Sequence, residues 1–314
     1  MIGQDTLAAL IRNVERVLVG KREAIELALV ALLSKGHLLI EDVPGLGKTI
    51  LARALAASLA MRFSRIQFVP DLLPSDVTGV SMFNQQRGAF ELKEGPIFTD
   101  LLLADEINRT TPRTQASLLE CMEERQVTID GVSRKLSPTF TVIATQNPIE
   151  FHGTYPLPEA QLDRFFARIA IGYPSLDQEV SIMEMQKSVH PIHGVTPVAS
   201  QEDLIAMQQA VAGLYVDPQV LRYIARIVEA TRGHQHLALG ASPRGSLALM
   251  RASQAMAFVA GMDFVEPHQV KRAVKAVLGH RLILTPQARL AGITTDRVLD
   301  EILGRIEIPL PAAA

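Results

Sequence analysis

Residues 41–49 read Glu41-Asp42-Val43-Pro44-Gly45-Leu46-Gly47-Lys48-Thr49, with an apolar run before them and an Ala/Leu-rich helical pattern after them. The run Leu38-Leu39-Ile40 predicts a short buried strand, the Pro and Gly residues end it, and a helix is expected from Lys48. A loop between such a strand and such a helix brings backbone N–H groups and the positive end of the helix to one point. The segment therefore predicts a phosphate-binding loop.

Individual residues of this loop have separate expected roles. Gly45 and Gly47 let the backbone turn tightly, Lys48 supplies a mobile cation for the β- and γ-phosphates, and the Thr49 hydroxyl suits a phosphate-bound Mg²⁺. Asp42 stands where the generic pattern G-x-x-x-x-G-K-S/T has its first glycine. The backbone at this position must therefore adopt a conformation that a non-glycine residue allows. A chance Gly-rich turn is the alternative, and the acidic motif described next argues against it.

A second apolar run, Leu101 to Ala104, ends abruptly in Asp105 and Glu106. In a parallel sheet both carboxylates would lie at the carboxyl edge, where ligands bind in open α/β folds. Asp105 is suited to hold the hydration shell of Mg²⁺, and Glu106 to polarise a water for attack on the γ-phosphate. A strand that simply ends in solvent is the alternative, but the phosphate loop roughly sixty residues upstream favours a nucleotide site.

Arg164 is expected on a short helix at residues 160–166. A guanidinium is the group best matched to the spread charge of a transferring phosphoryl group. A surface ion pair with Asp163 or Glu159 is the alternative for this side chain, and Arg168 is a weaker competitor for the same role.

Two further residues are candidates by position. Asn147 follows the strand expected at 140–145 and could orient the attacking water or contact the γ-phosphate, although an Asn-Pro pair alone is an ordinary turn. Arg244 lies in the first turn of a helix expected from Pro243, where a cation is unfavourable. An anion is therefore expected near Arg244, with a plain surface arginine as the alternative.

Composition limits the classes of function. The chain has 314 residues, enough for about two domains, and its net charge of -2 gives no overall electrostatic footprint for nucleic acid.

The single Cys121 excludes an internal disulfide and is expected to be a buried small hydrophobe, which fits a reducing compartment. Neither a signal peptide nor a membrane span is predicted, so the cytoplasm is the expected location. The loop-like histidines lack a convincing third metal ligand; they are His190, His193, His234 and His236.

The order of patterns predicts two domains. Strands alternate with helices up to about residue 171, which favours a mostly parallel sheet covered on both faces. Two hairpins are expected as insertions, at 78–96 and at 126–136, the second with the strong turn signal Asp130-Gly131. Beyond about residue 190 every pattern is helical. We therefore expect an α/β nucleotide-binding core at 1–190 and an all-helical domain at 191–314.

This order of motifs resembles that of an AAA+ ATPase, and within that superfamily it is similar to the MoxR group. Residues 65–76, Arg-Ile-Gln-Phe-Val-Pro-Asp-Leu-Leu-Pro-Ser-Asp, and residues 105–109, Asp-Glu-Ile-Asn-Arg, both resemble MoxR signatures. The resemblance runs from about residue 15 to the end of the chain. It implies a P-loop core with a five-stranded parallel sheet, hairpin insertions and a smaller helical lid. The loop with Asp42 is usual for this group.

The resemblance also implies roles for individual residues. Glu106 would be the catalytic carboxylate, Asn147 sensor 1, Arg164 the arginine finger and Arg244 sensor 2, acting within one chain or across an interface. Mg²⁺ would be held through Thr49 and Asp105. The residues expected to contact ATP are Val19 and Gly20 at the adenine, and Pro44, Gly45, Leu46, Gly47, Lys48, Thr49, Ile50 and Asp105.

The implied activity is ATP hydrolysis that drives chaperone-like remodelling or maturation of protein complexes by a ring, usually a hexamer. The hairpins would line the pore, with Phe83 and Phe90 touching a client unless they pack inside the protomer. A typical partner bears a von Willebrand factor A domain. The alternatives are a magnesium-chelatase-type motor subunit, a nucleic-acid-associated AAA+ ATPase, which the near-neutral charge disfavours, and a nucleotide-controlled scaffold with negligible turnover.

Overall fold

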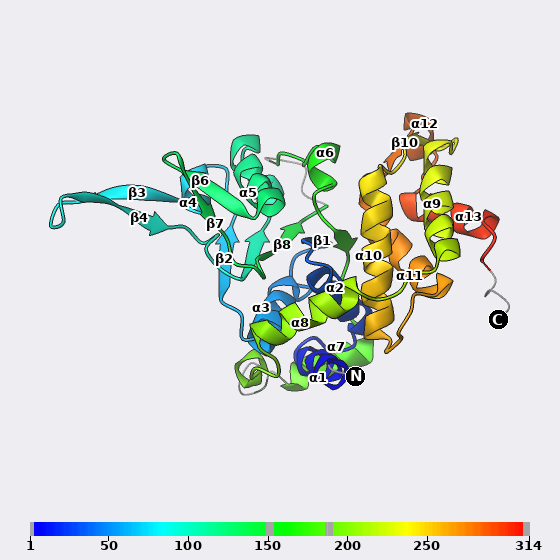
Figure 1. The fold of residues 1–314 in the computed structure, drawn as a ribbon, viewed down its shortest axis with the longest axis horizontal. Helices are drawn as coiled ribbons and strands as arrows, with labels where there is room; N and C mark the ends of the chain where they lie inside the picture. Colours follow the sequence, from blue (N-terminus) through cyan, green and yellow to red (C-terminus); the bar gives the residue numbers. More distant parts are fainter. Residues whose placement is uncertain (1–2, 149–153, 186, 188–190, 310–314) are drawn as a thin grey trace.

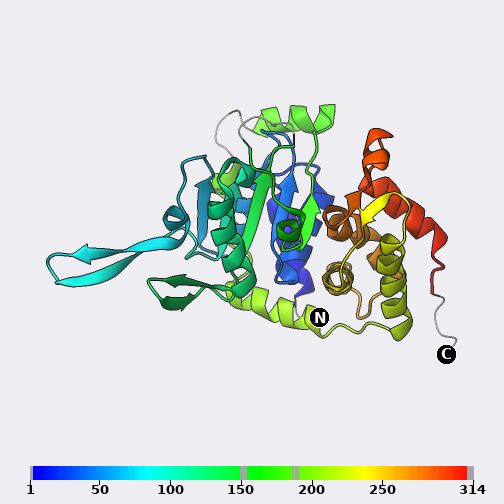
Figure 2. The ribbon, with the colours of Figure 1, turned by 90° about the horizontal axis from the view of Figure 1, so that it is seen from above.

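The computed structural model describes residues 3–148, 154–185, 187 and 191–309. At its centre lies a sheet of five parallel strands in the order β2-β5-β8-β1-β9, seen in the middle of Figure 2. The prediction of a five-stranded parallel sheet is therefore confirmed. The strands are Leu38–Glu41 (β1), Phe63–Gln67 (β2), Leu101–Asp105 (β5), Thr141–Gln146 (β8) and Ala167–Ile169 (β9).

Helices cover both faces of this sheet. Along β5, Leu101 and Leu103 belong to one apolar cluster, whereas Leu102 and Ala104 belong to another on the opposite face. Because both faces are buried, the central strands are apolar at every position rather than at alternate ones. The first cluster is covered by α1 (Gln4–Glu15), α2 (Arg22–Leu33) and α3 (Lys48–Ser58), and the second by α5 (Pro112–Glu124).

Both expected hairpins are present as separate antiparallel ribbons. The first consists of β3 (Gly79–Asn84) and β4 (Ala89–Glu94), and it extends far from the body of the molecule (Figure 1). The second consists of β6 (Gln126–Ile129) and β7 (Val132–Lys135). Its turn residues Asp130 and Gly131 both have positive φ, 50° and 77°, as the Asp-Gly signal predicts.

The region after residue 190 is helical, as expected, apart from one small two-stranded ribbon. Strands β10 (Leu237–Leu239) and β11 (Ile283–Leu284) form a small antiparallel ribbon, since the connections between helices satisfy their backbone groups by pairing with each other. The helices of this region are α8 (Gln201–Ala212), α9 (Pro218–Arg232), α10 (Pro243–Val259), α11 (Pro267–Leu278), α12 (Pro286–Leu290) and α13 (Thr295–Arg305), and α7 (Leu176–Met185) precedes it.

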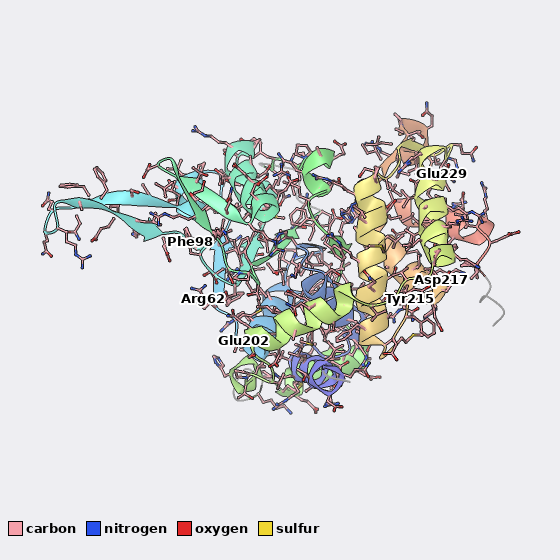
Figure 3. The ribbon with its side chains drawn as sticks, in the orientation of Figure 1. Arg62, Phe98, Glu202, Tyr215, Asp217 and Glu229 are labelled. Carbon is pink, nitrogen blue, oxygen red and sulfur yellow. The ribbon has the colours of Figure 1, made fainter. Side chains whose placement is uncertain are left out.

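The helical region packs directly on the core. The apolar cluster on the α1–α3 side of the sheet continues into α8, α10 and α11. At the base of the sheet, the buried Asp100 carboxylate accepts hydrogen bonds from the Arg62 backbone N–H (2.8 Å) and from Gln201 Nε2 at the start of α8 (2.7 Å). Figure 3 accordingly shows Arg62 close to Glu202, the next residue of α8. A division near residue 190 stays a prediction.

Several element bounds differ from those expected. The strand predicted from Ile97 begins at Leu101, because residues 95–98 turn and the Phe98 N–H bonds the Gly95 carbonyl. The helix predicted at 160–166 is the shorter α6 (Glu159–Leu162), since Phe166 already pairs with the start of β1 through the His37 carbonyl. The Pro-rich turn at 70–76 runs into a short helix, α4 (Pro74–Thr78).

His37 lies just before β1 and is fully buried between β8 and α5. Its Nδ1 accepts from the Val142 N–H (3.0 Å), so Nε2 carries the proton and donates to the Met122 carbonyl (3.0 Å). Burial lowers the pKa of His37 to about 4, and the nearby Arg125 charge acts in the same direction. The ring therefore folds in its neutral form.

This pairing predicts a loss of stability in mild acid. The folded-state pKa of His37 lies below its ordinary value of about 6.5, so its contribution is complete above that pH and is lost as the pH falls toward 4. Between pH 7.5 and 5 we expect His37 to lower the free energy of unfolding by about 2 kcal/mol in urea denaturation. His37→Gln should lose about 2 kcal/mol less over this interval, whereas the exposed-site control His193→Gln should behave as the parent. Equal losses in His37→Gln and parent would contradict the assignment.

Candidate functional site

The loop between β1 and α3 has the backbone of a phosphate cradle. Gly45 and Gly47 have φ of 88° and 89°, in the left-handed region that L-residues avoid. A Cβ on Gly47 would also lie only 2.8 Å from Leu18 Cδ1. The α3 helix starts at Lys48, so its unpaired N–H groups face the same loop. The Lys48 ammonium donates to the Asp42 carbonyl at 2.5 Å.

The loop and the acidic end of β5 enclose one cavity of about 360 Å³. The structure thus brings together the sequence-predicted cation, hydroxyl and carboxylates, while Leu46 does not line this cavity. The lining residues are Pro44, Gly45, Gly47, Lys48, Thr49, Ile50, Arg65, Gln67, Asp105 and Glu106.

Both carboxylates at this cavity are engaged by side chains of the neighbouring strands β2 and β8 and of the turn that follows β5. Asp105 accepts from Arg65 Nη2 at 2.6 Å on one oxygen and from Thr145 Oγ1 at 2.5 Å on the other. Glu106 accepts from Gln67 Nε2 at 2.7 Å and forms an ion pair with Arg109 at 3.0 Å. The acidic groups are therefore held in place by defined partners.

Glu106 also has an unusual backbone. Its φ of 57° and ψ of 49° place a non-glycine residue in the left-handed region, which is costly and is often found at functional sites. Its N–H donates to the same Thr145 hydroxyl that holds Asp105, at 2.9 Å. Thr145 at the end of β8 thus fixes both carboxylates.

Sequence reasoning missed the partners of these acids. Arg65 and Gln67 are two residues apart on β2, so their side chains share one face, and Gln67 pairs with Asp105 across the β2–β5 ladder. The spacing alone could have suggested a shared face. Their approach to Asp105 and Glu106, however, depends on strand order and register, which one sequence does not specify.

Asp42 explains the departure from the generic loop. Its Oδ2 accepts from the backbone N–H groups of Ile171 (2.8 Å) and Gly172 (2.7 Å), and its Oδ1 accepts from the Val43 N–H (2.9 Å). The carboxylate thus ties the start of the phosphate loop to the segment after β9. A glycine at this position would leave that connection unmade.

A second cavity, of about 510 Å³, lies where Gly20 was expected to contact a base. Its lining includes Gly20, Glu41 and Arg168 from the core, together with Lys275 and Asp296 from the helical region. Arg168 pairs with Glu41 at 2.8 Å inside it, so this competitor faces a different space from Arg164. Val19 is half-buried and is not among the lining residues.

None of the remaining candidates lines the loop cavity of its own chain. Arg164 sits in the turn after α6, not on the helix as predicted, and pairs with Glu123 of α5 at 3.3 Å. Arg244, in the first turn of α10, contacts the same Glu123 at 2.6 Å, which raises the pKa of the guanidinium. Neither arginine lines the phosphate-loop cavity. Asn147 follows β8 and is buried.

Other sequence-based expectations have simple outcomes. Cys121 is buried, as expected, and burial raises its pKa to about 12. Within the described ranges, no three His, Cys, Asp or Glu side chains gather to hold a metal ion, and His190 lies outside those ranges. A search of the same residues finds no helix with the length and apolar character needed to cross a bilayer.

Comparison with known families gives two matches. Residues 37–167 match the ATPase family associated with various cellular activities (AAA), and residues 229–302 match the AAA lid domain. The first match contains the phosphate loop, the acidic end of β5 and both hairpins. The second contains Arg244.

Individual proteins are similar over nearly the whole of this chain. Chaperone MoxR1 of Mycobacterium tuberculosis is 41% identical over 97% of this chain and 82% of its own length. The uncharacterized protein YeaC of Bacillus subtilis is 48% identical over 98% of this chain and 96% of its own. A crystal structure of a candidate ATPase from Cytophaga hutchinsonii superposes with a TM-score of 0.92 at 37% identity, covering 98% of this chain and 96% of that one.

The hydrogen bonds made by the Asp42 carboxylate predict that its removal lowers the stability of the protein. Asp42→Ala leaves the N–H groups of Ile171 and Gly172 without their acceptor, so we expect the free energy of unfolding to fall by about 2 kcal/mol. Urea denaturation at neutral pH measures the change. The exposed Asp71→Ala is the matched control and should change stability little. An Asp42→Ala protein as stable as the Asp71→Ala protein would show that the contact contributes nothing.

Proposed function

The chain belongs to the MoxR family of AAA+ ATPases, and we propose that it uses ATP hydrolysis in a ring of subunits to remodel or mature protein complexes. The observation that carries the nucleotide part of the proposal is the single cavity that Lys48, Thr49, Asp105 and Glu106 line together. The observation that carries the remodelling part is the projecting β3–β4 hairpin with its exposed aromatic pair.

At the nucleotide, Lys48 and the N–H groups of the loop bind the β- and γ-phosphates. The Thr49 hydroxyl and the Asp105 carboxylate suit Mg²⁺, because both are oxygen donors that line the same cavity. When bound, this ion neutralises phosphate charge and favours departure of the leaving oxygen. Gly20 lines the second cavity, which we propose takes the base.

Glu106 is the proposed general base. Gln67 and Arg109 both contact its Oε2, so the carboxylate is held at the cavity in a defined position from which it can accept a proton from water. Asn147, which follows the neighbouring strand, is proposed to orient that water.

Arg164 and Arg244 are proposed to act on the γ-phosphate of the next subunit. Two observations support action in trans: neither side chain lines the loop cavity of its own chain, and both are partly exposed beside Glu123. A ring, which we propose to be hexameric, would place such a cationic edge against the neighbouring phosphate loop.

The β3–β4 hairpin is the proposed client-binding arm. Phe83 and Phe90 lie opposite each other on its two strands, with ring centroids 5.3 Å apart, and remain 55% and 74% exposed. The alternative that these rings pack inside the protomer is therefore wrong. From family resemblance we also propose a partner bearing a von Willebrand factor A domain.

Because Lys48 is proposed to bind the phosphates and Glu106 to activate water, their variants should show different defects. Lys48→Ala should abolish binding of a fluorescent ATP analogue, whereas Glu106→Gln should bind it normally and release phosphate about 10²-fold more slowly. Glu120→Gln, on the exposed face of α5, is the matched control and should match the parent. A Glu106→Gln protein that binds no nucleotide would overturn these roles. Negligible phosphate release by the parent would instead favour the scaffold alternative.

Exposure of the aromatic pair predicts its part in client capture. In a Glu106→Gln background, which should stall the ring with its client bound, Phe83→Ser with Phe90→Ser should reduce the captured protein about tenfold or more, since these rings supply exposed apolar contact. Leu290→Ser, at an even more exposed apolar position far from the hairpin, should capture as much as the parent. Captured proteins are compared by quantitative mass spectrometry. Unchanged capture by the hairpin variant would assign the client surface elsewhere.

A further inference from the structure

A buried arginine of the helical region holds the turn that carries Arg164. Arg281 follows α11, and only 5% of its side chain is exposed. Its Nε donates to Asp163 Oδ1 at 2.7 Å, and Nη2 donates to the carbonyls of Phe165 (2.7 Å) and Asp163 (3.3 Å). Nη1 donates to the Phe166 carbonyl at 3.2 Å and to that of Val277 in α11.

These bonds surround Arg164 in sequence without touching its side chain. The guanidinium contacts residues 163, 165 and 166, so the backbone on both sides of Arg164 is fixed from the helical region. Five N–H donors in a rigid plane suit this task, and a lysine could not reproduce them. The direction in which Arg164 leaves the turn thus depends on where Arg281 lies.

Arg244 is connected to the same unit. Its neighbour Gly245 lies so close to Leu278 and Arg281 that an added Cβ would be 3.2 Å from Leu278 Cδ2 and 3.6 Å from Arg281 Cδ. On the core side, Glu123 contacts both Arg164 and Arg244. Two ion pairs therefore cross the boundary between core and helical region, Glu123 with Arg244 and Asp163 with Arg281, and Glu123 also contacts Arg164 within the core.

We propose that Arg281 is a positioning residue through which the helical region sets the orientation of Arg164, and that Glu123 keeps Arg164 and Arg244 together as one cationic pair. The inference rests on the proposed action of Arg164 in the neighbouring site. A shift of α11 moves the turn at 163–166 with it, so the state of the lid in one subunit is transmitted to the phosphate cavity of the next. Arg281 itself touches no substrate.

The decisive variant is Arg281→Lys, which keeps the charge and loses the planar donors. We expect kcat to fall about tenfold or more while KM for ATP stays within about twofold, since misplacement of a catalytic group affects the chemical step. Arg297→Lys makes the same change on α13 of the helical region, away from the turn, and should match the parent. In an Arg164→Ala background, Arg281→Lys should cause no further loss. A fully additive loss would overturn the proposal.

Mixed rings separate this proposal from the function on which it rests. A subunit with a misplaced Arg164 keeps its own phosphate loop, so Arg281→Lys mixed with Lys48→Ala should recover activity, as should Arg164→Ala mixed with Lys48→Ala. Recovery with Arg164→Ala but not with Arg281→Lys, after co-assembly is verified, would overturn only the positioning role. No recovery with either would overturn action in trans.

A variant on the other partner keeps the test usable if Arg281→Lys does not assemble. Asp163→Asn removes the charge opposite Arg281 and leaves the carbonyl contacts in place. Compared with Arg281→Lys, it should show a smaller fall in kcat, with KM again unchanged and activity again recovered on mixing with Lys48→Ala. An Asp163→Asn enzyme with parental kcat would contradict the proposal.

Discussion

Parallel pairing of β5, β8 and β1 is the constraint on which the site depends. Because the three strands are adjacent and point the same way, the acidic end of β5, Asn147 after β8 and the phosphate loop after β1 all lie at one edge of the sheet. Residues separated by about a hundred positions in sequence are thus neighbours in space. Burial of the strands on both faces makes this alignment rigid.

A second feature of the fold is that the two carboxylates at that edge have hydrogen-bond and ion-pair partners within the protein. Asp105 is held by Arg65 and Thr145, and Glu106 by Gln67 and Arg109. Carboxylates that face one cavity repel each other, and these donors offset the repulsion. The same contacts hold both carboxylates in fixed positions at the cavity.

The sequence was sufficient for features that are local. The loop around Lys48, the apolar strand that ends in Asp105 and the Asp130-Gly131 turn each follow from a few adjacent residues, and the order of strands and helices predicted the parallel sheet. The sequence was insufficient for contacts that join segments far apart along the chain. The roles of Arg65, Glu123 and Arg281 depend on register and on helix packing, and the β10–β11 ribbon forms only because two connections lie side by side. Arg164 was displaced from its predicted helix because Phe166 pairs with the His37 carbonyl.

The β3–β4 hairpin stands outside the central sheet, so neither of its edges is covered by another strand of that sheet. Ribbons of this kind invite unwanted pairing with other chains, a risk that charged side chains reduce. Here Arg87 and Glu91 form an ion pair next to the aromatic rings, and each ring shelters part of the other. The same few residues thus supply both the apolar contact surface of the arm and the charges that keep it from pairing with other copies. A further increase in its apolar surface would favour self-association.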